Sequence, residues 1–141
     1  MDFFKNLKVA YKAGDKALYS GRKSKLNNQY WHQEILVSHI EGSKNNKPTD
    51  IGIVGYVCDE GVKRNQGRIG ARKGPKSVRN KLGKLPIHFK DKKITDFGNV
   101  VCIDKNLEDC QKALSKTISM FIRRNIFPIA IGGGHDIAYA N

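Results

Sequence analysis

A short apolar run, 127–131, leads into three glycines and then His135 and Asp136. An apolar run of this length that stops at turn residues predicts a buried strand, and the glycines predict a tight turn that side chains can approach without crowding. In open α/β sheets, ligands bind at the carboxyl ends of the strands. The segment therefore predicts a parallel sheet with His135 at its ligand-binding edge.

Two further strands and two helices are predicted upstream of this run. Residues 50–57 are rich in Ile, Val and Gly, which is typical of a central parallel strand, and 94–103 form a second extended segment. Gly74 and Pro75 begin a helix with an apolar stripe of Val78, Leu82 and Leu85, and Pro86 stops it. The order strand, loop, helix, strand, helix, strand predicts part of a three-layer α/β/α fold.

The helix before the last strand has the clearest pattern in the chain. Asn106 is a suitable N-cap, acidic residues follow it, and Arg123 and Arg124 stand at the other end. One side is predicted to face the sheet through seven residues: Leu107, Cys110, Leu114, Thr117, Ile118, Phe121 and Ile122.

Residues 1–48 lack such periodicity and predict an N-terminal arm with short helical pieces, followed by the α/β domain at 49–141. Within the arm, Trp31 and His32 are expected to anchor it to the core, with a lid or a subunit contact as the alternative. The run 43–48 predicts a polar connector.

The order Gly-Gly-Gly-His-Asp after an apolar strand resembles the first metal-binding motif of the ureohydrolases, the arginase and agmatinase family of manganese enzymes. The stretch 58–75 is similar to the formimidoylglutamase branch of that family, as are Gly21-Arg22 and Trp31-His32-Gln33. The resemblance implies an arginase-like α/β fold with a parallel sheet. It also implies two Mn²⁺ ions bridged by hydroxide, with His135 as a ligand of one ion and Asp136 as a support for the loop.

The family's remaining metal ligands come from an Asp-x-His-x-Asp segment and an Asp-x-Asp segment, and neither pattern occurs between Met1 and Asn141. One imidazole cannot hold two ions whose ligands include several carboxylates. The chain is therefore expected to be the N-terminal portion of a longer enzyme, and to be inactive alone.

The resemblance implies hydrolysis of a linear amidine, N-formimidoyl-L-glutamate, to L-glutamate and formamide in histidine degradation. This small-molecule substrate carries two carboxylates, and arginine pairs with a carboxylate through two hydrogen bonds. The long basic loop 58–74 follows the strand at 50–57 at the same sheet edge as His135. It offers Arg64, Arg68, Arg72 and Asn65, of which Asn65 and Arg68 are the predicted substrate-binding residues. For any single arginine, the alternative is that it is solvated or ties the loop to a neighbouring subunit. Agmatinase, guanidino-acid hydrolase and an inactive binding or assembly module are the alternative functions.

The formal net charge of +13 raises the question of a nucleic-acid partner. Because the basic residues are scattered and no aromatic and basic platform occurs, no nucleic-acid binding is predicted. No apolar run reaches the ~18 residues of a membrane span, so a cytoplasmic enzyme without membrane contact, homo-oligomeric when intact, is expected. Cys58, Cys102 and Cys110 have no C-x-x-C spacing and are odd in number, so neither a zinc site nor a disulfide framework is predicted. Buried or partly buried free thiols are expected instead.

Overall fold

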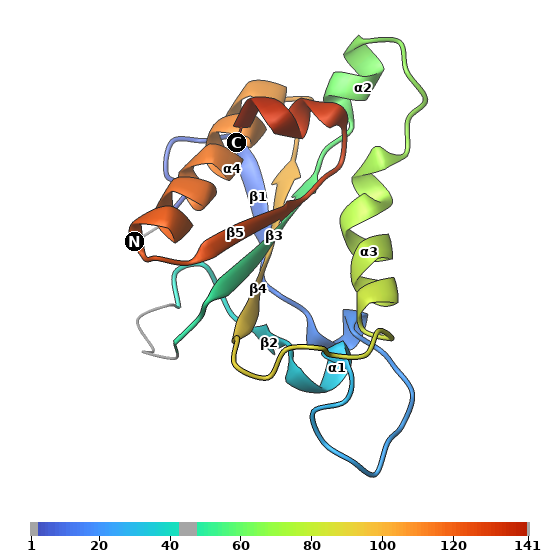
Figure 1. Cartoon of the computed structure of the whole chain (residues 1–141). Coiled ribbons are helices and arrows are strands. Elements are labelled where there is room, and N and C mark those ends of the chain that lie inside the picture. Colours follow the sequence, from blue (N-terminus) through green and yellow to red (C-terminus); the bar gives the residue numbers. More distant parts are fainter. Residues whose placement is uncertain (1–2, 43–47, 141) are drawn as a thin grey trace.

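The computed structural model describes residues 3–42 and 48–140, in which five strands form one sheet (Figure 1). The strands are β1 (Val9–Lys12), β2 (Leu36–Val37), β3 (Ile51–Val57), β4 (Ile94–Cys102) and β5 (Phe127–Ile131). Their order is β1-β4-β3-β5, and β2 also pairs with β4. All pairs are parallel except β1 with β4. The predicted central strands are confirmed, within a mixed and mostly parallel sheet.

Helices cover both faces of this sheet, which gives the predicted three layers (Figure 1). On one face, α4 (Leu107–Arg123) and the short 3-10 helix η3 (His135–Ala140) pack on the larger apolar cluster, which includes Val54, Tyr56 and Val100. On the other face, α3 (Gly74–Leu82) and the arm pack on a smaller cluster around Ile53 and Ile94. Alternate residues of β3 thus face the two helical layers, as a strand in a three-layer fold requires.

The prediction for α4 is confirmed at its cap and over most of its buried side. The side chain of Asn106 accepts a hydrogen bond from the backbone N–H of Asp109 at 3.1 Å. Six of the seven predicted residues are buried, but Ile122 is 59% exposed. Among residues 3–42 and 48–140, no helix, α4 included, has the length and apolar character needed to cross a membrane.

The apolar stripe predicted for α3 is wrong. Val78 is 44% exposed and Leu85 is 50% exposed, whereas Arg79 is 1% exposed and Pro75 is also buried. The helix turns Arg79 toward the middle of β4, where it finds a buried carboxylate, and this interaction outweighs burial of Val78. Leu82 is partly buried and packs against the smaller apolar cluster.

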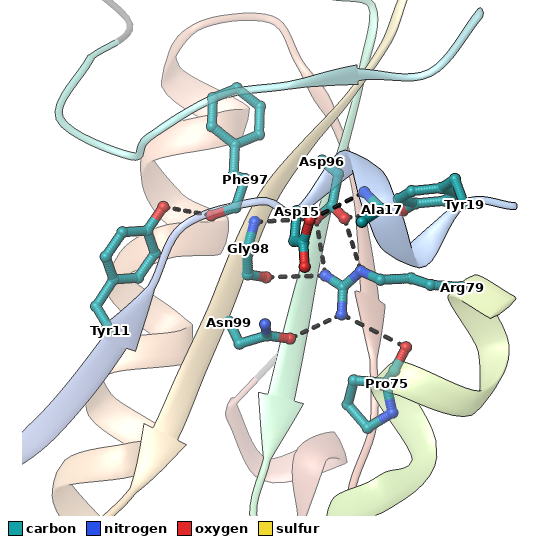
Figure 2. Close-up of polar contacts among 10 residues, drawn as sticks. All are labelled: Tyr11, Asp15, Ala17, Tyr19, Pro75, Arg79, Asp96, Phe97, Gly98 and Asn99. Carbon is teal, nitrogen blue, oxygen red and sulfur yellow. Dashed lines mark hydrogen bonds and ion pairs between the residues drawn. The ribbon is translucent and has the colours of Figure 1, made fainter. Parts of the chain in front are cut away.

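Arg79 is the centre of a buried polar cluster that joins α3, β4 and the arm (Figure 2). Its Nε donates to Asp96 Oδ2 at 2.6 Å and its Nη2 donates to Asp96 Oδ1 at 2.7 Å, while Nη1 donates to Asn99 Oδ1 at 2.7 Å. The hydroxyl of Tyr19 donates to Asp96 Oδ2 at 2.8 Å. Burial opposes the charged guanidinium, but hydrogen bonds and the charge of Asp96 outweigh it and raise the pKa of Arg79. Both charges are therefore paired rather than merely buried.

Two glycines make room for this cluster. Gly98 has a φ of 83°, which favours glycine, and its backbone N–H donates to Asp96 Oδ1 at 2.9 Å. A Cβ at Gly55 would lie 2.1 Å from Oδ1 of Asn99. The β3 and β4 register also shifts between Ile53 and Gly55, so the polar cluster coincides with an irregularity in the ladder.

The arm contains more strand than predicted, because it contributes β1 and β2 to the sheet. Its helical pieces are η1 (Lys16–Leu18) and α1 (Trp31–Glu34). Trp31 meets Phe89 edge to face with ring centroids 5.3 Å apart, and His32 Nδ1 lies 3.0 Å from the carbonyl oxygen of Gly83. The anchoring role predicted for Trp31 and His32 is confirmed. Most of the predicted connector, 43–47, lies outside the described residues.

Candidate active-site edge of the sheet

The glycine turn after β5 closes over the carboxyl end of β3. The backbone N–H of Gly133 donates to the carbonyl oxygen of Tyr56, and that of Gly134 donates to the carbonyl oxygen of Cys58, both at 2.9 Å. A Cβ at Gly133 would lie 2.0 Å from the Cys58 oxygen, so a side chain there would force the two segments apart. The glycine run therefore sets the position of His135 relative to β3.

His135 begins η3 and its side chain is exposed, which leaves the imidazole accessible to a ligand. Asp136 points inward, where its Oδ2 accepts a hydrogen bond of 2.6 Å from the hydroxyl of Tyr56. Burial and this hydrogen bond raise the pKa of Tyr56, which keeps its phenol protonated as the donor. This contact agrees with the supporting role predicted for Asp136.

The donor set at this edge fits part of a manganese site. Manganese accepts imidazole and carboxylate oxygen, and Oδ1 of Asp136 is buried without a hydrogen-bond partner in the described part of the chain. Such an atom is costly unless an ion, a donor or water satisfies it. Within residues 3–42 and 48–140, however, no group of three possible metal ligands includes His135. At the glycine turn the described residues supply one accessible imidazole, that of His135, and the supporting carboxylate of Asp136, which is too few ligands for two ions.

The segment 58–74, predicted as one long loop, contains α2 (Glu60–Arg64) and the 3-10 helix η2 (Ala71–Lys73). Its two ends pack against the glycine turn and η3. A Cβ at Gly61 would lie 2.6 Å from Oδ1 of Asp136, and a Cβ at Gly74 would lie 2.6 Å from the carbonyl oxygen of Gly132. The segment and His135 therefore lie at the same edge of the sheet, as the strand order predicts.

The arginines of this segment differ in what they contact. Arg64 donates to the carboxylate of Glu108 on α4 and to the carbonyl oxygen of Lys105, and it also pairs with Glu60. Asn65 and Arg68 are exposed on the stretch after α2, and no hydrogen bond to another described residue involves either side chain. Arg64 thus has a structural role here, while Asn65 and Arg68 are free to meet a ligand.

The three cysteines are free thiols and are buried or half-buried, as predicted. The structure adds what their spacing in the sequence conceals: the Sγ atoms of Cys58, Cys102 and Cys110 all lie within 4.8 Å of one another. Cys58 and Cys102 also border a cavity of about 270 Å³ at this edge.

A mostly parallel sheet between two helical layers, with a glycine turn that presents a histidine at its carboxyl edge, defines an arginase-like α/β domain. The arginase family domain matches residues 49–141, and the chain belongs to the arginase family.

Its curated relatives include the formimidoylglutamase of Clostridium tetani, which is 36% identical over 96% of this chain and 42% of the relative. The formimidoylglutamase of Geobacillus thermodenitrificans is 35% identical over 93% of this chain and 42% of the relative. The chain thus spans less than half the length of these relatives.

Similar solved structures are likewise longer than this chain. The chain is 32% identical to a single-residue variant of Trypanosoma cruzi formiminoglutamase solved with Mn²⁺, with a TM-score of 0.62 over 72% of this chain and 36% of that one. A second T. cruzi structure, an arginase superfamily protein, is 30% identical with a TM-score of 0.61 over 74% of this chain and 38% of that one.

Proposed function

We propose that this chain forms the N-terminal part of a manganese-dependent hydrolase that converts N-formimidoyl-L-glutamate and water to L-glutamate and formamide. The observation that carries the proposal is the glycine turn that holds an accessible His135 at the carboxyl edge of a parallel sheet. The formimidoylglutamase relatives support the substrate, and the Mn²⁺ of the similar T. cruzi formiminoglutamase structure supports the metal. Two bound Mn²⁺ ions would supply a nucleophilic hydroxide near neutral pH.

The chain's own residues would contribute position and charge. His135 would be a ligand of one ion, and the exposure of its side chain supports this role. Asp136 would hold η3 in place through Tyr56, whose 2.6 Å hydrogen bond joins η3 to β3. Asn65 and Arg68 would bind the substrate carboxylates, for which a guanidinium offers two parallel donors. Their exposed position and lack of partners among the described residues support this role.

Exposed apolar residues on the edge strand β5 support the proposal that further strands extend the sheet beyond the described residues. Phe127 is 66% exposed and Ile129 is 37% exposed on this strand. The described part of the chain pairs β5 with β3 only. Exposed apolar edge strands favour pairing with further chain.

We expect the 141-residue chain alone to bind Mn²⁺ weakly and to release no formamide, because the described residues at the glycine turn offer one accessible imidazole, that of His135, for two ions. The comparison is a chimera in which this chain replaces the matching N-terminal part of C. tetani formimidoylglutamase. Bound Mn²⁺ and formamide release are measured for both proteins. An active, manganese-loaded 141-residue chain would defeat the proposal that it is one part of the site.

Arg68→Ala in that chimera should raise the KM for N-formimidoyl-L-glutamate by about tenfold, because one charge-assisted hydrogen bond contributes about 1.5 kcal/mol or more. The kcat should change little. Arg123→Ala is the matched control, since Arg123 is also exposed but lies at the end of α4, before β5. Equal KM values for the two variants would leave Arg68 as a solvated surface residue.

A further inference from the structure

We propose that Cys58, Cys102 and Cys110 form a binding site for one thiophilic metal ion of the Zn²⁺ type, distinct from the manganese ligand His135. Three thiol sulfurs from three separate elements converge within 4.8 Å of one another. Thiolates select zinc and other soft ions, whereas manganese prefers oxygen and imidazole ligands. The chemistry of this cluster therefore differs from that of the proposed hydrolytic centre.

The fold itself brings the three sulfurs together. Val57 pairs with Val101 across β3 and β4, so Cys58 and Cys102 follow as neighbours at the ends of adjacent parallel strands. Cys110 lies in the first turns of α4, fully buried above the same end of the sheet. A tetrahedral ion with Zn–S bonds of about 2.3 Å needs sulfurs about 3.8 Å apart. The observed spacing lies within rotamer adjustment of that value.

A cavity provides access and a fourth ligand position. It has a volume of about 270 Å³, and Cys58 and Cys102 are among its lining residues. The carboxylates of Asp59, Glu60 and Asp104 also line it, so one of them or a water molecule can complete a tetrahedron. The cavity thus gives an ion access to Cys58 and Cys102, and the buried Sγ of Cys110 lies within 4.8 Å of both.

The cavity lining carries both signs of charge. Three thiolates and one Zn²⁺ leave a single negative charge, and three cationic residues line the cavity beside the three carboxylates: Lys63, Arg72 and Lys105. Binding would release the thiol protons to solvent as each S–H is replaced by S–Zn.

The test uses the reduced 141-residue chain under anaerobic conditions, titrated with Zn²⁺ against a chromophoric chelator. We expect one Zn²⁺ per chain and, by mass spectrometry, protection of the half-buried Cys102 from alkylation, since Cys58 and Cys110 are buried even without an ion. Cys102→Ala should weaken binding by more than about a hundredfold, because even outer-shell partners of metal ligands contribute 10–100-fold. Cys102 is only half-buried, so its truncation is the mildest of the three.

His135→Ala is the control that separates this site from the proposed hydrolytic centre, and it should bind Zn²⁺ with unchanged affinity. The alkylation count on the unsubstituted chain needs no variant, so a folding defect in Cys102→Ala cannot hide the result. Any one of four outcomes would overturn the site: Cys102 alkylated equally with and without Zn²⁺, equal affinity in Cys102→Ala, loss of binding in His135→Ala, or oxidation to a disulfide in air with no Zn²⁺ uptake by the reduced chain.

Discussion

Asp96→Ala should lower the free energy of unfolding by about 3–5 kcal/mol, because it leaves the buried guanidinium of Arg79 without its counter-charge. Arg79 and Asp96 have 1% and 0% of their side-chain surfaces exposed, so water cannot replace the lost carboxylate. The substitution also removes the acceptor for Tyr19 and for the backbone of Gly98. Urea unfolding measured by circular dichroism and by the fluorescence of Trp31 gives the difference.

Asp91→Ala is the matched control for this prediction. Asp91 pairs with Lys92 at 4.0 Å, but its side chain is 80% exposed, and such surface pairs contribute little. The control should change stability by less than about 0.5 kcal/mol. If Asp96→Ala were as mild as the control, the cluster in Figure 2 would not be what holds α3 and the arm on the sheet.

His135→Ala in the chimera should reduce formamide release by more than about a hundredfold, through loss of the proposed manganese ligand. Its fold should be unchanged because the side chain is exposed. Bound Mn²⁺ per chain and kcat/KM are the quantities to measure, and both should fall together.

His88→Ala provides the control for residue type, since His88 is also exposed but lies between α3 and β4, away from the glycine turn. This variant should keep full Mn²⁺ content and activity. Equal effects of the two substitutions, or undiminished Mn²⁺ binding in His135→Ala, would remove His135 from the proposed metal site.

The sequence predicts the central strands and α4 well because their apolar patterns match their environments. The run from Phe127 to Ile131 forms a strand that ends at a glycine turn, and Asn106 caps α4. The juxtaposition of the segment 58–74 with His135 also follows from strand order alone, because parallel strands end at the same edge.

The burial of Arg79 cannot be predicted from the sequence because it depends on a partner in another element. An arginine within α3 looks like a solvated residue until Asp96, on β4, is placed opposite it. The same holds for the thiol cluster, whose members Cys58, Cys102 and Cys110 have no regular spacing and meet only when β3, β4 and α4 assemble. Strand β1 escapes prediction for a related reason, since four residues with mixed polarity pair with β4 through the backbone.

Formamide release from N-formimidoyl-L-glutamate by the purified chimera, with and without Mn²⁺, tests the central claim most directly. The remaining C. tetani portion expressed without this chain shows what that portion does alone. We predict turnover that depends on Mn²⁺, stops when the ion is removed by a chelator, and is absent from the C. tetani portion. A folded, manganese-loaded chimera that releases no formamide would contradict the proposed function.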